Sequence, residues 1–211
     1  MVSPTSRANA SRTRRQEIML AALDCFTAAG VEATTIEDIR ARSGASVGSI
    51  YHHFGSKEKL AGALNVEALR DYQDGFLREL KRHSDAEPGL RAVVAYHLSW
   101  VSKNANWARF LLATREADFM IEAEDTVQEM NLTFSEELAA WRQPHIESGA
   151  MVQLPADLYR PLLVGPLHEF SRQWLSGRGT STMAEARSVL ANAIWQAMKG
   201  SERTPPEGPQ P

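Results

Sequence analysis

The spacing of apolar residues predicts helices along almost the whole chain. In the segment from Thr13 to Ala29, apolar side chains recur every three or four positions, which is the spacing of one buried helical face. The apolar positions are Ile18, Ala22, Cys25, Phe26 and Ala29. Gly30 follows them and suits the left-handed conformation that ends many helices. We therefore expect a first helix over residues 13–29.

Residues 35–54 predict two short helices joined by a tight turn. Thr35 is a good N-cap, and Asp38 stands three positions later, as in a capping box. Gly44 can adopt a positive φ and end the first helix. Ser46 can then cap a second helix that runs to about residue 53. With the helix over 13–29, this pair would form a three-helix unit.

The second helix of this pair has one face for a core and one for solvent. Ile50 and Phe54 lie four positions apart and can both face a core. The residues left pointing outward are Val47, Gly48, Ser49, His52 and His53. Small residues near the start of a helix and imidazole groups near its end suit insertion into the DNA major groove. Periodicity alone does not separate such a unit from a generic αα-hairpin.

The rest of the chain continues as helices with no convincing strand. The expected ranges are 57–82, 90–103, 107–116, 121–142, 155–175 and 183–198. The breaker cluster 84–89 separates two of these helices, and Pro144 and Gly149 bound a loop. We therefore predict an all-α chain of about nine helices.

Several short strings are more specific than the periodicity. They are Gly30-Val31, Ala33-Thr34-Thr35-Ile36, Asp38-Ile39, Ser46–Phe54 (SVGSIYHHF) and Ser56–Leu60 (SKEKL). Together they closely resemble the DNA-binding domain of the TetR/AcrR family of bacterial transcriptional regulators, over about residues 14–64 without a gap. The remaining two thirds resemble that family in architecture only.

The resemblance and the helix pattern together imply four segments. Residues 1–12 would be a disordered basic N-terminal arm, and 13–60 a helix-turn-helix DNA-binding domain. Residues 61–200 would form a helical effector-binding and dimerisation domain. Residues 201–211, which include four prolines, would be a disordered tail.

The resemblance also assigns DNA contacts to nine residues. Caps that face phosphates would be Thr35 and Ser46. Residues near base edges would be Val47, Gly48, Ser49 and His53, and residues near phosphates Tyr51, His52 and Lys57. Residues 47–54 include no Arg, Asn or Gln for a bidentate base contact. Contacts to thymine methyl groups, backbone readout or DNA deformability would have to contribute to specificity.

The charge distribution agrees with a DNA-binding N-terminal end. The formal net charge is −3, yet residues 1–60 contain eight Lys and Arg against six Asp and Glu. Four arginines and no acidic residue fall within the first 15 positions. A basic end on an acidic protein localises its attraction for phosphate. The alternative is a terminus that only increases solubility.

Aromatic side chains in the expected effector domain predict an apolar pocket with a few polar groups, the usual composition of a small-molecule site. The candidate lining is His97, Trp100, Trp107, Phe110, Arg115, Gln128, Trp141, His145 and Phe170. The alternative is that these aromatic residues only fill the core.

The last two expected helices have broad apolar faces that predict a homodimer interface. The candidate contacts are Leu163, Leu167, Phe170, Trp174, Leu190, Ala193, Ile194 and Ala197. The alternative is that both faces pack internally. Dimerisation is also what DNA recognition requires, because two recognition helices about 34–36 Å apart read successive major grooves.

Several other classes find no support in the sequence. One cysteine excludes an internal disulfide framework, and no run of about 18 apolar residues could span a membrane. The absence of a signal-peptide pattern places the chain in the cytoplasm. His97, His145 and His168 are scattered singly, with no spacing typical of metal ligands, so we predict no metal site and no cofactor. The chain has no P-loop or Rossmann motif, which argues against an enzyme of those classes.

These observations predict a ligand-responsive repressor that binds a palindromic double-stranded DNA operator as a homodimer. The identity of its small-molecule effector is not predicted. One alternative is a helical small-molecule-binding or enzymatic protein in which the helix-turn-helix is only a packing module. Another is a regulator that responds to a protein partner.

Overall fold

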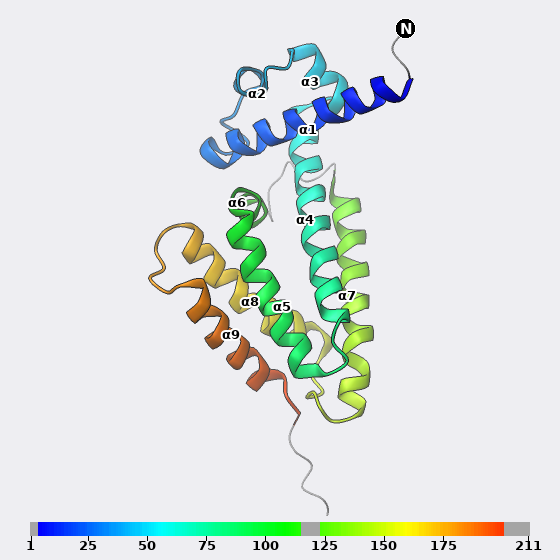
Figure 1. Cartoon of the computed structure of the whole chain (residues 1–211), viewed down its shortest axis with the longest axis vertical. Helices are drawn as coiled ribbons and strands as arrows, with labels where there is room; N and C mark the ends of the chain where they lie inside the picture. Colours follow the sequence, from blue (N-terminus) through cyan, green and yellow to red (C-terminus); the bar gives the residue numbers. More distant parts are fainter. Residues whose placement is uncertain (1–3, 115–122, 201–211) are drawn as a thin grey trace, which may run out of the picture. The chain divides into compact units, whose positions relative to one another are not determined.

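A computed structural model describes residues 4–114 and 123–200, and within these residues it contains nine helices and no strand (Figure 1). The helices are α1 Pro4–Ala29, α2 Ile36–Ser43, α3 Val47–Phe54, α4 Lys57–Lys81, α5 Ala86–Lys103, α6 Ala105–Ala113, α7 Glu124–Glu147, α8 Ala156–Leu175 and α9 Met183–Met198. The predicted all-α fold class is therefore confirmed.

Three helix boundaries differ from the expected ones by four residues or more. The first is that α1 begins at Pro4, so residues 4–12 lie in a helix where a disordered arm was predicted. Proline is well tolerated in the first turn, where its missing N–H has no intrahelical partner. The second is that α5 begins at Ala86, before the expected residue 90, and contains Pro88 in its first turn, where proline is tolerated for the same reason. The third is that α7 continues through Pro144, although proline removes one intrahelical hydrogen bond.

The described residues divide into two compact units. The first contains residues 4–71, 104–114 and 123–130, and the second contains 72–103 and 131–200. Helices α4 and α7 therefore contribute to both units. The sequence interpretation assigned α6 to the second domain, but in the structure α6 packs on α1 in the first unit.

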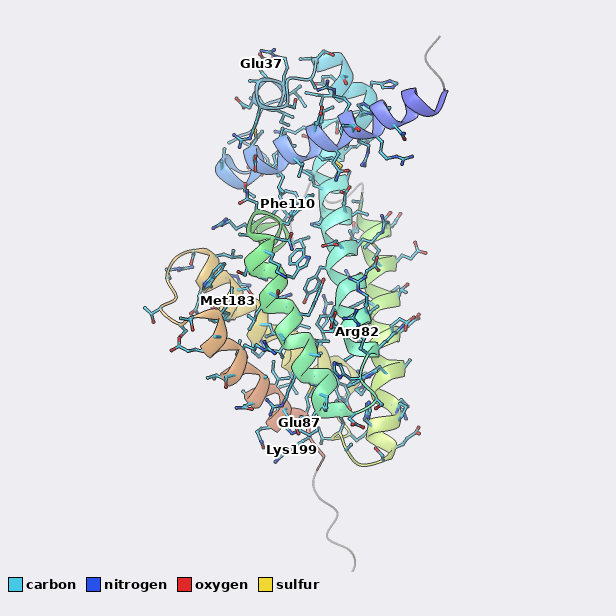
Figure 2. All side chains as sticks on the ribbon, in the orientation of Figure 1. Glu37, Arg82, Glu87, Phe110, Met183 and Lys199 are labelled. Atoms are coloured by element: carbon cyan, nitrogen blue, oxygen red, sulfur yellow. The ribbon has the colours of Figure 1, made fainter. Side chains whose placement is uncertain are left out.

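The core of the first unit is built around α1. This helix packs on α2, α3 and α6. Ile18, Ala22 and Phe26 on its inner face are buried, as their spacing predicted. The ring of Phe26 stacks on that of Phe110 from α6, with a centroid distance of 6.0 Å. Figure 2 labels Phe110 on α6. The contact fixes α6 to the helix that supports the helix-turn-helix.

In the second unit, α5 packs on both α8 and α9, and these two helices also pack on each other (Figure 1). A polar chain crosses its apolar core. The hydroxyl of Tyr72 lies 2.8 Å from Nδ1 of His97, and the hydroxyl of Ser171 lies 2.9 Å from Nε2 of the same ring. All three residues are buried, so each polar group is satisfied inside the core.

Candidate nucleic-acid interface

Helix α2 begins with the capping box that the sequence predicted. The hydroxyl of Thr35 accepts a hydrogen bond from the backbone N–H of Asp38 at 3.2 Å. In return, the Asp38 carboxylate accepts from the Thr35 hydroxyl at 2.7 Å and from its backbone N–H at 2.8 Å. These hydrogen bonds, first that from the hydroxyl and then that from the backbone, lower the pKa of Asp38. The carboxylate therefore stays ionised and the start of α2 is fixed.

A glycine turn then sets the direction of α3. Gly44 has φ 64°, and its N–H donates to the carbonyl of Arg40 at 3.0 Å. Ser46 caps α3, because its hydroxyl accepts from the backbone N–H of Ser49 at 3.1 Å. Both ends of the turn are thus closed by local hydrogen bonds, which orient α3 relative to α2.

Helix α3 has one buried and one exposed side. Ile50 and Phe54 are buried and anchor the helix to the core of the first unit. Val47, Gly48, Tyr51 and His52 are exposed, with Tyr51 49% and Val47 37% accessible. We call these four residues the exposed face of α3. Ser49 and His53 are half-buried beside it.

Lys57, at the start of α4, makes contacts that the sequence did not predict. Its ammonium group donates to the backbone carbonyls of Glu32 at 3.0 Å and Thr34 at 2.9 Å. The side chain thereby ties the α1–α2 connection to α4. The expected contact of Lys57 with a DNA phosphate would have to share its ammonium with these two carbonyls.

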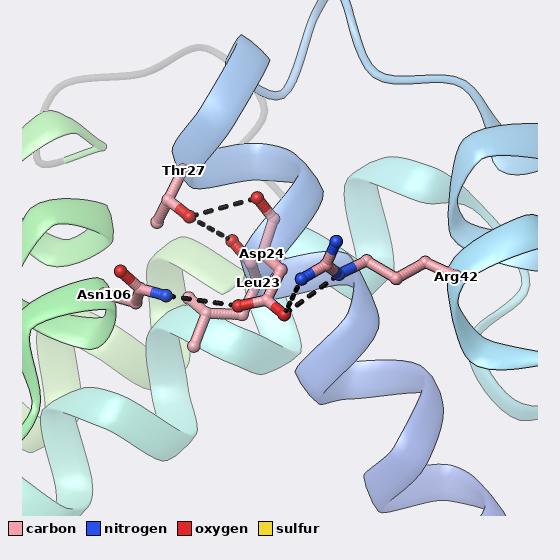
Figure 3. A network of polar contacts seen from close by, with 5 residues as sticks. All are labelled: Leu23, Asp24, Thr27, Arg42 and Asn106. Carbon is pink, nitrogen blue, oxygen red and sulfur yellow. Dashed lines mark hydrogen bonds and ion pairs between the residues drawn. The ribbon is translucent and has the colours of Figure 1, made fainter.

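A polar network links three helices of the first unit (Figure 3). The Asp24 carboxylate in α1 accepts from Nε and Nη2 of Arg42 in α2, and from Nδ2 of Asn106 in α6. No sequence pattern predicts this network, because positions 24, 42 and 106 are far apart in the chain and belong to no shared motif.

Comparisons with known proteins agree with this geometry. Residues 18–64 match the model of the family described as bacterial regulatory proteins, tetR family. The segment over residues 18–64 is a DNA-binding domain of the TetR family. The matched segment begins in α1 and ends in α4, so it contains the C-terminal part of α1 and the whole of α2 and α3, with the exposed face of α3.

The relatives of this chain include two curated repressors. It is 42% identical to the transcriptional repressor KstR2 of Mycolicibacterium smegmatis over 62 residues, which are 29% of this chain and 28% of the relative. It is 30% identical to KstR2 of Rhodococcus jostii over 139 residues, which are 63% of this chain and 65% of that relative. The matches thus span less than two thirds of either relative.

The fold as a whole also resembles solved structures. FadR of Bacillus subtilis, solved in complex with stearoyl-CoA, superimposes with a TM-score of 0.73 at 19% identity. The superposition covers 85% of this chain and 96% of the FadR chain. At this identity the likeness establishes a shared fold of both units and nothing about the ligand.

The nine residues predicted to contact DNA lie at the starts of α2 and α4 and in or next to α3. Thr35 caps α2, Ser46 caps α3, and Lys57 begins α4. The other six residues are within α3. In the free protein, the hydroxyls of Thr35 and Ser46 serve the helix caps, so these two residues position the backbone of the interface.

The residues predicted to line one effector pocket do not come together. Trp107, Phe110 and Gln128 belong to the first unit, where Phe110 is buried in the core and Gln128 is exposed. Arg115 lies outside the described residues. The predicted lining is therefore divided between the two units.

The other predicted lining residues belong to the second unit. His97 and Trp100 fill its core, and Phe170 is half-buried on α8. The rings of Trp141 and His145 are in contact in a tilted arrangement, with centroids 4.5 Å apart. Of the predicted set, only Trp141 lines the cavity described next.

A cavity of about 180 Å³ lies within the second unit, and we call it the α7–α8 cavity. Side chains from α4, α5, α7, α8 and α9 surround it, together with Met151 from the segment between α7 and α8. The lining residues are Leu80, Leu90, Ser135, Leu138, Ala139, Trp141, Arg142, Met151, Ala156, Tyr159, Arg160, Leu163 and Met198. Arg142 was not among the predicted lining residues. Its position beside Trp141, on a largely apolar helical face, could have indicated that it lines a pocket.

The structure leaves part of the predicted dimer face accessible and buries the rest. Leu163, Leu167 and Ile194 are buried within the second unit, so they cannot contact a second chain. Ala193 and Ala197 are exposed, and Phe170, Trp174 and Leu190 are half-buried. Val189 and Leu158, which are 64% and 43% accessible, extend the apolar surface of these helices. The expected face was too broad because periodicity does not show which edge of a helix faces its own core.

Two further searches concern metals and membranes. Among the described residues, no group of three or more His, Cys, Asp or Glu side chains is arranged to hold a metal ion. In the same part of the chain, no helix is both long and apolar enough to cross a membrane.

Proposed function

We propose that this protein is a ligand-responsive transcriptional repressor that binds a palindromic DNA operator as a homodimer. One observation carries the proposal. The exposed face of α3 carries small and aromatic residues, while Ile50 and Phe54 on its other side hold the helix rigidly on the core. A capped, anchored and partly exposed short helix suits insertion into the major groove.

DNA contacts would come from the exposed face of α3 and from the start of α4. Val47 and Gly48 offer apolar contact and close backbone approach to base edges. Tyr51 and His52 offer donors for phosphates without long flexible side chains. Because α3 has no Arg, Asn or Gln, part of the sequence specificity would come from DNA shape.

The dimer would form through the outward faces of α8 and α9. Val189, Ala193 and Ala197 are exposed along α9, and Leu158 is exposed on α8. Small residues at these positions allow helices of two chains to approach closely. A two-fold axis between them would produce two recognition helices, as a palindromic operator requires.

The effector would bind in the second unit and shift the population of conformers that fit the operator. By linkage, operator DNA would then change effector affinity by the same factor. The solved complex of FadR with stearoyl-CoA shows that a protein of this fold can hold a small molecule. No comparison supports the alternative of an enzyme that retains the helix-turn-helix only for packing.

The deciding experiment is selection of bound fragments from a random duplex DNA pool by the full chain, at about 150 mM salt, where charge attraction is screened beyond about 8 Å. We expect an enriched motif with two-fold symmetry. Tyr51→Ala and His52→Ala should weaken binding to that motif and make it less salt-dependent, because each lost phosphate contact reduces the salt slope by about 0.9. Leu132→Ala, on an exposed position of α7, is the matched control. If a folded dimer enriches no motif, the proposed function is wrong.

A further inference from the structure

The lining of the α7–α8 cavity includes an arginine, Arg142, with one unpartnered donor. Nε of Arg142 is buried and has no hydrogen-bond partner, the one such side-chain nitrogen or oxygen in the described part of the chain. Buried polar groups in folded proteins almost always have a partner, and an exception points to a functional role. The donor belongs to a residue that lines the cavity.

A rigid platform holds this arginine in place. Its guanidinium carbon lies 3.7 Å from the centre of the Tyr159 ring, a cation–π distance. Tyr159 is itself fixed, because its hydroxyl donates to the carbonyl of Val152 at 2.8 Å and accepts from the N–H of Leu154 at 2.9 Å. Stacking on a ring face leaves the in-plane N–H groups of the guanidinium available for a ligand.

The rest of the cavity favours one sign of charge. Its lining includes Arg142 and Arg160 and no Asp or Glu. Most of the remaining lining is apolar, including Leu80, Leu138 and Met198. An apolar space with a positive group at its wall suits a molecule that is apolar at one end and anionic at the other.

We infer that the α7–α8 cavity binds a small organic carboxylate. The carboxylate would accept hydrogen bonds from the Nε edge of Arg142, the bidentate geometry that guanidinium groups form with carboxylates. The apolar body of the ligand would lie against the leucines. This inference deepens the proposed function, since it gives the chemical class of the effector.

The cavity volume limits the size of this ligand. A volume of 180 Å³ holds about six groups the size of a water molecule, at about 30 Å³ each. Hexanoate and benzoate are of this size. Hexanamide keeps the shape of hexanoate but has no negative charge, so it is the matched neutral probe.

The test is titration calorimetry of the full chain, without DNA, with hexanoate and with hexanamide. We expect hexanoate to bind at least about tenfold more tightly, because hydrogen bonds to charged partners are stronger than neutral ones. Arg142→Met should remove this preference by weakening hexanoate alone. Arg172→Met, which removes an exposed arginine of α8 that bonds Glu169 outside the cavity, should change neither affinity.

Two further variants separate binding from folding. Ala139→Phe keeps Arg142 but fills the cavity, so it should abolish binding of both probes. Arg142→Lys keeps the positive charge without the Nε–H edge, so it should bind hexanoate more weakly than the wild type. Circular dichroism and Tm identify any variant that fails to fold.

The inference is overturned if hexanoate and hexanamide bind alike, as they would if a buried water satisfied Nε. It is also overturned if folded Arg142→Met retains the preference. Neither result depends on DNA. A chain that prefers hexanoate but selects no duplex motif would instead overturn the proposed function and leave the carboxylate site in place.

Discussion

The carboxylate of Asp24 accepts hydrogen bonds from Nε and Nη2 of Arg42 at 2.9 and 2.6 Å, and its other oxygen accepts from Asn106 at 3.1 Å (Figure 3). One side chain in α1 thereby contacts α2 of the helix-turn-helix and α6. The Arg42 side chain is 56% accessible and that of Asp24 is 35% accessible, so water screens the ion pair. Its main effect is to fix the relative position of three helices.

Asp24→Asn is expected to lower the Tm more than Glu17→Gln. Both substitutions remove an acid from α1, but Glu17 pairs only with Arg14 in the same helix, whereas Asp24 joins separate helices. Thermal unfolding should be measured at low salt and at 1 M NaCl, where the Debye length is about 3 Å. The difference should shrink at high salt. Equal Tm values for the two variants at low salt would contradict a linking role for Asp24.

Gly48→Ala is expected to stabilise the free protein and to weaken operator binding. No atom lies within 4 Å of the position of a Cβ on Gly48, so alanine fits without strain. Alanine favours a helix interior over glycine by about 0.5–1 kcal/mol, so the Tm should rise. If α3 enters the major groove, the added methyl group meets the DNA, and operator affinity should fall. Fluorescence anisotropy with the selected duplex checks this, and unchanged affinity would argue against close approach at Gly48.

Lys57→Met separates two roles for this lysine. If Lys57 mainly ties the α1–α2 connection to α4, its loss leaves two carbonyls without a charged donor. Stability should then fall by about 1–3 kcal/mol. Urea unfolding checks this, with Lys103→Met, at an exposed position of α5, as a control. If Lys57 mainly contacts a DNA phosphate, Lys57→Met should instead leave stability unchanged and make DNA binding less dependent on salt. That result would show that the phosphate contact, and not the tie to the two carbonyls, is the main role of the ammonium.

Short-range signals explain why the helix-turn-helix was predicted well. The capping box of Thr35 and Asp38, the left-handed Gly44 and the cap at Ser46 all act within four residues, so they can be read directly from the sequence. Apolar spacing likewise predicted the burial of Ile50 and Phe54.

Long-range contacts explain most of the errors. The α7–α8 cavity brings together side chains from five helices, and no spacing rule relates Leu80, Arg142 and Met198. The tie between Lys57 and the carbonyls of Glu32 and Thr34 spans more than 20 positions and involves backbone atoms, which leave no mark on residue type. Residue types predicted that a pocket exists, but only packing decides which side chains surround it.

The buried His97 is expected to make the protein less stable as the pH falls. Burial, assisted by the nearby His168, lowers the pKa of His97 to about 3, so the folded protein keeps it neutral. The unfolded chain binds a proton near pH 6.5, and stability is therefore lost progressively as the pH falls from about 6.5 towards 3. The Tm of the wild type should drop between pH 7 and pH 5 by more than that of His97→Gln. Parallel Tm profiles would show that other groups dominate the acid response.

Val189→Glu is expected to weaken dimerisation and, through it, operator binding. Val189 is 64% accessible in the single chain, so a glutamate there adds no buried charge to the fold. In the proposed dimer the same carboxylate would be buried against a second chain, where an unpaired charge is strongly unfavourable. Leu132→Glu is a close control, because Leu132 is 59% accessible on α7, away from the proposed interface. Sedimentation velocity should show that the Val189→Glu dimer dissociates at a higher protein concentration than the wild-type and Leu132→Glu dimers. Operator affinity should fall in parallel, because one recognition helix makes too few contacts. If both variants remain dimeric at the same concentration, the dimer does not use this face of α9.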